Sequence, residues 1–181
     1  MANPPYRDEI IQFGKRIVVT IKKKWQMSPV CIHFRAGDAQ FALEYEKTLN
    51  YVMSEALNST FYSPCRPIIF ITDAIEEDKE RALAHFHTIF SRIYTIENFR
   101  SLQRETNKQL GFHLDVLHYE QILCACTSGF IGHPGSTFSQ RIEYMMKKNI
   151  CKLESHSLGI EGIGEEEEQI VVEEEENVSA Q

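Results

Sequence analysis

Residues Phe130–Ile142 read FIGHPGSTFSQRI, and this stretch decides the class of fold. The pattern predicts a short buried strand at Phe130 and Ile131, a turn rich in Gly and Pro, and a helix that begins near Ser136. The first N–H groups of a helix lack intrahelical acceptors and favour anions, so this turn suits a phosphate. A tight strand-to-helix connection with a Ser cap is the alternative, and the stretch alone favours that alternative.

Other apolar runs predict further strands at Val30–Phe34, Ile68–Ile71 and Ile93–Ile96. Apolar residues that recur every three or four positions predict helices between the strands. These are Arg7–Trp25, a helix from Phe41 to Ala56, Ile75–Phe86, Leu114–Thr127 and Ser136–Lys148. The polar stretch Glu97–Gly111 fits either a loop or a partly helical segment. Strands that alternate with helices predict an α/β fold with a Rossmann-like, mostly parallel sheet and helices on both faces.

Charge divides the chain into two parts. All 19 Lys and Arg residues precede Leu153, whereas ten of the 26 Asp and Glu residues follow it. We therefore expect one α/β domain over residues 1–152 and an acidic, disordered tail over residues 153–181. The body is only mildly basic, which suits an anionic ligand and argues against nucleic acid. No apolar run is long enough to predict a membrane span, and the N-terminus lacks the pattern of a signal peptide.

The five cysteines are odd in number and have no zinc-type spacing. Cys124 and Cys126 flank Ala125 inside an apolar segment that is predicted to be helical. Free cysteines in such surroundings behave as small hydrophobic residues. We therefore expect buried thiols rather than a metal site.

Three polar clusters follow predicted strands: His33–Asp38, Thr72–Asp73 and Ser136–Thr137. Ligands of open α/β sheets bind beyond the carboxyl ends of the strands, so these clusters are candidates for a site. Arg35 is the strongest candidate, because a guanidinium grips a phosphate through two parallel hydrogen bonds. An ion pair between Arg35 and Asp38 is compatible with that role.

Single residues in these clusters have simpler explanations as well. His33 shares the side of its strand with Arg35, yet a lone His is more often a hydrogen-bonded core residue. Asp73 is expected to cap the helix that follows it. Outside these clusters, Glu120 could accept two N–H donors from guanine. Taken alone, Glu120 is better explained as an acid on the solvent-facing side of a helix. The sequence contains no P-loop, no G-x-S-x-G, no His-Glu-x-x-His and no Rossmann G-x-G-x-x-G.

Four segments together resemble the GDP-fucose protein O-fucosyltransferases, and the nearest likeness is the branch that modifies thrombospondin-type repeats. In chain order they are Ile32–Asp38, with the pattern His-x-Arg-x-x-Asp, then Phe70–Ala74, Tyr119–Cys124 and Phe130–Ile142. The resemblance implies a metal-independent, inverting GT-B glycosyltransferase, of which this chain matches the C-terminal, donor-binding half. No cofactor is implied, because GDP-fucose is the donor substrate.

By its matching positions, the resemblance implies that Arg35 contacts the β-phosphate of GDP-fucose as the leaving group develops charge. Glu120 falls where the family has a guanine-reading Asp. The residues implied to bind GDP-fucose are His33, Phe34, Arg35, Asp38, Glu120, Ser136, Thr137 and Phe138.

The family's acceptors are thrombospondin-type or EGF-like repeats, and its members act in the endoplasmic reticulum. Its first glycine-rich donor loop and its catalytic acid lie in an N-terminal half that these segments do not match, so no general base is assigned. The alternative is a non-catalytic nucleotide- or protein-binding α/β module on the same fold.

Overall fold

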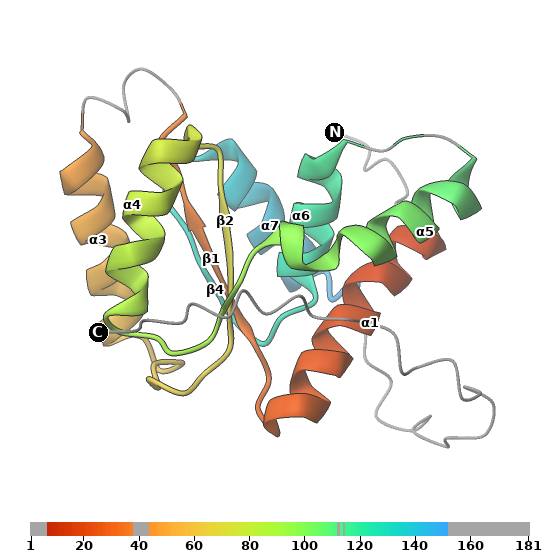
Figure 1. Cartoon of the computed structure of the whole chain (residues 1–181), viewed down its shortest axis with the longest axis horizontal. Helices are drawn as coiled ribbons and strands as arrows, with labels where there is room; N and C mark the ends of the chain where they lie inside the picture. Colours follow the sequence, from red (N-terminus) through yellow and green to blue (C-terminus); the bar gives the residue numbers. More distant parts are fainter. Residues whose placement is uncertain (1–6, 38–43, 112, 114, 152–181) are drawn as a thin grey trace, which may run out of the picture.

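A computed structural model describes residues 7–37, 44–111, 113 and 115–151 (Figure 1). The described residues contain one parallel sheet of four strands in the order β3-β2-β1-β4. The strands are β1 (Val30–Phe34), β2 (Ile68–Thr72), β3 (Ile93–Tyr94) and β4 (Phe130–Ile131). The predicted α/β fold is therefore confirmed. The expected acidic tail at residues 153–181 lies outside the described residues.

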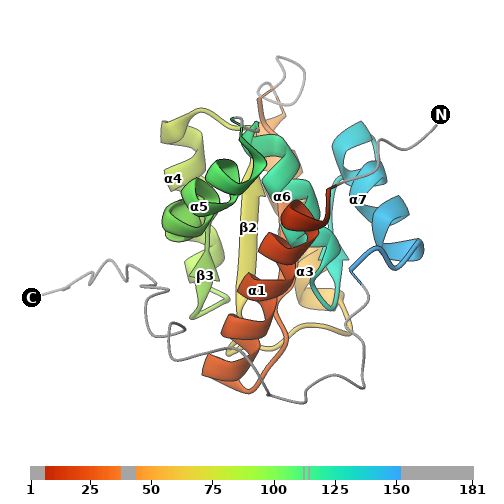
Figure 2. The ribbon, with the colours of Figure 1, turned by 90° about the vertical axis from the view of Figure 1, so that its right-hand side faces the viewer.

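Helices cover both faces of the sheet, as Figure 1 shows. On one face lie α3 (Tyr45–Asn58) and α4 (Glu76–His87). On the other face lie α1 (Asp8–Trp25), α5 (Arg100–Leu110), α6 (Val116–Ala125) and α7 (Thr137–Lys147). Seen after a quarter turn, α1 and α6 cross in front of the sheet (Figure 2).

Strand β1 contributes side chains to a separate hydrophobic core on each side of the sheet. Cys31 belongs to the core under α1, α5, α6 and α7, and His33 shares its face because side chains alternate along a strand. Ile32 and Phe34 belong to the core under α3 and α4. All five residues of β1 are buried, which agrees with a central parallel strand.

One segment differs from the prediction in detail, and a second takes the helical form of its two predicted alternatives. The strand expected at Ile93–Ile96 ends at Tyr94, because the side chain of Asn98 accepts the N–H of Thr95 at 2.7 Å and opens a short 3-10 helix, η1 (Ile96–Phe99). The polar stretch after it is helix α5, which ends at Gly111 in the left-handed region, with φ 73°.

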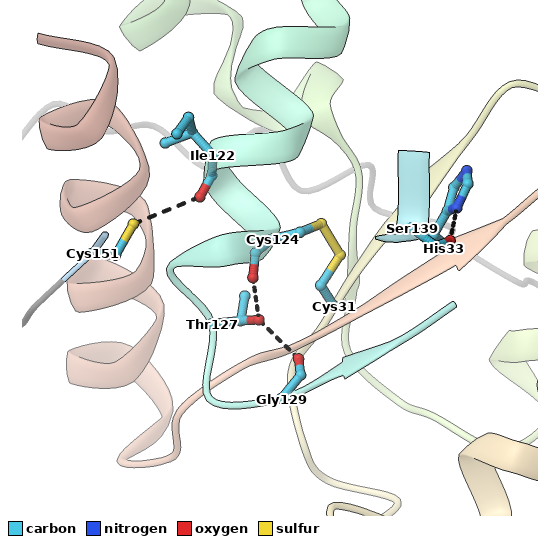
Figure 3. Close-up of a disulfide and its surroundings, with 8 residues drawn as sticks. All are labelled: Cys31, His33, Ile122, Cys124, Thr127, Gly129, Ser139 and Cys151. Carbon is cyan, nitrogen blue, oxygen red and sulfur yellow. Dashed lines mark hydrogen bonds between the residues drawn. A yellow bond between two sulfur atoms is a disulfide. The ribbon is translucent and has the colours of Figure 1, made fainter. Parts of the chain in front are cut away.

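The cysteines correct the expectation of buried thiols. A disulfide joins Cys31 of β1 to Cys124 of α6 (Figure 3). A second disulfide joins Cys126, at the end of α6, to Cys151. Cys65 is exposed and free. The sequence separations are 93 and 25 residues, so local spacing carried no sign of either bond.

Candidate functional site

A cavity of about 390 Å³ opens at the carboxyl edge of the sheet. Strands β2 and β4 pair with opposite sides of β1, so the order of the strands reverses there. Such a reversal is where open α/β sheets bind ligands. Residues in the last positions of β1 and β2, or directly after them, line the cavity together with side chains of α6 and α7. They are His33, Arg35, Thr72, Asp73, Leu117, Glu120, Gln121, Thr137, Phe138 and Arg141.

Arg35 directly follows β1 and contacts residues from two other parts of the site, the start of α7 and the end of β2. Its Nη1 donates to Ser136 Oγ at 3.4 Å and lies 3.7 Å from Asp73 Oδ2. The expected ion-pair partner, Asp38, lies outside the described residues, and the structure gives Asp73 as a partner instead. The guanidinium is therefore held beside the start of α7.

Asp73 does not have the expected role of a helix cap. Its Oδ1 accepts the backbone N–H of Ala36 at 2.8 Å and that of Gly37 at 3.0 Å. Strand register explains this position, because Phe34 pairs with Thr72 and the next residues of the two strands are therefore neighbours. Asp73 thus fixes the backbone that follows Arg35.

The start of α7 forms a second wall of the cavity. Ser136 is the N-cap, and its Oγ accepts the N–H of Ser139 at 3.3 Å. Thr137 and Phe138 follow and line the cavity. In any helix the first N–H groups have no intrahelical acceptor and favour an anion. Gly132 permits the close packing of this turn, because a Cβ there would lie 2.6 Å from Ser139 Oγ.

His33 is both a hydrogen-bonded core residue and part of the cavity wall. It is 3% exposed, and its Nδ1 shares a hydrogen bond of 2.8 Å with Ser139 Oγ (Figure 3). Its ring also packs on Phe138, with 4.8 Å between centroids. Burial lowers the pKa of His33 to about 4, although the charge of Asp73 opposes that shift. His33 is therefore a neutral side chain near pH 7.

Phe34 points away from the cavity. Its side chain is fully buried in the core under α3 and α4, where its ring centroid lies 5.3 Å from that of Tyr45 and 6.4 Å from that of Phe70. The side chain of Phe34 therefore does not line the cavity, and a contact of this residue with GDP-fucose stays a prediction.

Glu120 lies inside the molecule, and its interpretation as a solvent-facing helix acid is wrong. The residue is 7% exposed and lines the cavity from α6. Burial is the main cause that raises the pKa of Glu120 to about 8, and the nearby charge of Glu97 adds to it. Lys79 acts in the opposite direction. Glu120 is therefore largely a neutral acid at pH 7.

Thr72 and Asp73 form one of the predicted polar clusters, and the remaining lining residues were not predicted as site residues. Helical spacing was the signal that could have found most of them, because side chains three or four positions apart on a helix are neighbours. Counting back three positions from Glu120 gives one residue on α6, and counting on four positions from Thr137 gives one on α7. The residues added by the structure are Leu117, Gln121 and Arg141.

Across residues 7–37, 44–111, 113 and 115–151, no three His, Cys, Asp or Glu side chains gather as they would around a metal ion. The helices of this part of the chain include none with the length and apolar character that crossing a bilayer requires. Comparison of the chain with family models, with curated proteins and with solved structures finds no match in any of the three.

Proposed function

We propose that this chain binds GDP-fucose as the donor-binding half of a GT-B protein O-fucosyltransferase. The reaction is inverting transfer of fucose to a Ser or Thr of a folded module, such as a thrombospondin-type or EGF-like repeat. One observation carries the proposal. The guanidinium of Arg35, the first turn of α7 and the carboxyl group of Glu120 surround a single cavity at the carboxyl edge of the sheet.

The proposal places the diphosphate between Arg35 and α7. Two different groups that favour anions meet there, since Arg35 Nη1 lies 3.4 Å from the N-cap Ser136 Oγ. The backbone N–H groups of Thr137 and Phe138 suit one phosphate, and the guanidinium suits the other. Arg35 on the β-phosphate stabilises the charge that develops as the bond to fucose breaks.

The nucleobase belongs at Glu120 in this proposal. Within the part of the chain that the structure describes, the carboxyl group of Glu120 has neither a hydrogen bond nor an ion pair. A ligand in the cavity that supplies N–H donors gives this carboxyl group hydrogen-bond partners. The N1–H and 2-amino groups of guanine are such donors.

Two observations bear on the compartment and on catalysis. The disulfides Cys31–Cys124 and Cys126–Cys151 suit an oxidising compartment such as the lumen of the endoplasmic reticulum.

Of the two acids that line the cavity, Asp73 is bound to two N–H groups and Glu120 is largely neutral at pH 7. Neither is placed to act as a general base, which favours a non-catalytic nucleotide-binding module as the second candidate.

Calorimetry tests the proposal with GDP-fucose, GDP and UDP. At about pH 8.5, where Glu120 is mainly ionised, we expect GDP-fucose and GDP to bind and UDP to bind at least tenfold more weakly, since uracil offers one N–H where guanine offers two donors. A chain that is folded by circular dichroism and binds neither guanine nucleotide contradicts the proposal. Both candidates bind the donor without turnover by themselves, so fucose transfer to a Ser or Thr acceptor with the N-terminal half of a family member supplied separately distinguishes the enzyme half from the non-catalytic module.

A further inference from the structure

Glu120 differs from an ordinary buried acid because it faces a cavity rather than a packed core. It lies on α6 one turn before Cys124, whose disulfide ties the helix to β1. The residue is 7% exposed and lines the cavity that also contains Arg35. In the described part of the chain its carboxyl group has no hydrogen-bond or ion-pair partner. The position therefore suits a carboxyl group that forms its hydrogen bonds only when a ligand occupies the cavity.

The charges around Glu120 disfavour its ionised form. The charged groups that act on Glu120 are Glu97 from η1, Asp115 from the cap of α6, Asp73 after β2 and Lys79 from α4. The single cation among them is already paired, because Lys79 Nζ lies 2.9 Å from Glu97 Oε1. The cations that line the cavity itself are Arg35 and Arg141.

The two protonation states of a carboxyl group present different patterns to a purine. An ionised carboxylate accepts from both N1–H and the 2-amino group of guanine, and hypoxanthine lacks the second donor. A neutral acid instead accepts from N1–H and donates its O–H to O6, which guanine and hypoxanthine both offer. We propose that Glu120 selects the nucleobase through its protonation state, with the ionised form selecting guanine and the neutral form accepting both purines.

This inference rests on the proposed guanine nucleotide site and gives it a pH dependence. Burial and the neighbouring carboxylates hold the pKa of Glu120 near 8. Either protonation state can therefore be populated by choosing a pH at which the folded protein can be studied. We expect GDP and IDP to bind with similar affinity at about pH 6. At about pH 8.5 we expect GDP to bind about tenfold more tightly than IDP, as the loss of one charge-assisted hydrogen bond requires.

The matched control is Glu120→Gln. Its amide keeps one donor group, the NH2, and one acceptor group, the carbonyl oxygen, at every pH, so it imitates the neutral acid at nearly the same size. We expect this variant to bind GDP and IDP about equally from pH 6 to pH 8.5. Purine N1–H groups themselves begin to titrate in alkaline solution, and the variant reports that contribution separately.

Calorimetric titration of the full chain with GDP and with IDP across this pH range decides the inference. A GDP preference that grows with pH in the wild type and not in Glu120→Gln supports it. A constant GDP preference overturns the inference and leaves the proposed function standing. Failure of both nucleotides to bind at every pH overturns the proposed function and the inference with it. If the variant does not fold, a constant GDP preference in the wild-type series still overturns the inference.

Discussion

The carboxylate of Asp73 faces the guanidinium of Arg35, with 3.7 Å between Asp73 Oδ2 and Arg35 Nη1. The other oxygen, Oδ1, accepts the N–H groups of Ala36 and Gly37. Gly37 permits this approach, because a Cβ there would lie 2.3 Å from the backbone oxygen of Asp73. One side chain thus positions both the cation and the backbone that carries it.

Substitutions at Asp73 should separate these two effects. Asp73→Asn keeps an oxygen that accepts both N–H groups, so we expect its affinity for GDP to stay within about threefold of the wild type. Asp73→Ala leaves two N–H groups without their acceptor and releases the turn, so we expect affinity for GDP to fall about tenfold. Guanosine affinity should change in neither variant. Calorimetry checks this, and wild-type GDP binding by Asp73→Ala would show that Asp73 does not position Arg35.

The two disulfides should contribute unequally to stability. Cys31–Cys124 closes a separation of 93 residues and Cys126–Cys151 one of 25 residues, and longer loops lose more entropy when they are closed. We expect removal of the first pair by Cys→Ala substitution to cost about 4–5 kcal/mol and removal of the second about 3–4 kcal/mol. Urea unfolding measures both, with exposed Cys65→Ala as the control. A larger loss for the second pair would contradict this ordering.

Glu120 should also make stability depend on pH. Its pKa is about 8 in the folded chain against an ordinary value of 4.5, so the folded state holds a proton that the unfolded chain releases between these values. The stability due to this group is complete below about pH 4.5 and is lost as pH rises through about 8. Glu120→Gln never ionises, so its melting temperature relative to the wild type should rise over that range.

Thermal unfolding at about pH 5 and about pH 8.5 measures this difference. His33 has the opposite effect, because its lowered pKa adds stability as pH rises from about 4 to 6.5. That contribution is present in both proteins and cancels in the comparison. A difference in melting temperature that is the same at both pH values would show that Glu120 does not hold its proton in the folded state.

The sequence predicted the parts of the fold that depend on local pattern. The limits of β1 and β4 agree with the prediction, because Pro29 and Gly132 bound their apolar runs. The start of α7 also agrees, since Ser136 caps it as expected. Strand ends, hydroxyl caps and apolar periodicity are all visible within a few residues of sequence.

Features that depend on distant neighbours could not be predicted in the same way. Every residue from Tyr119 to Ala125 is buried, because α1 and α7 both pack on α6, and this burial makes Glu120 part of the cavity. The role of Asp73 follows from the register of two strands whose pairing residues are 38 positions apart. Disulfide partners likewise depend on which elements the sheet brings together.

Binding of GDP, GMP and guanosine to Arg35→Ala is the most direct test of the central claim, that Arg35 and the start of α7 bind the diphosphate. Arg16→Ala, on the exposed side of α1, is the matched control. We expect Arg35→Ala to weaken GDP binding about 10- to 100-fold, GMP binding much less and guanosine binding not at all, because only GDP has a β-phosphate. Equal losses for all three ligands would contradict the account.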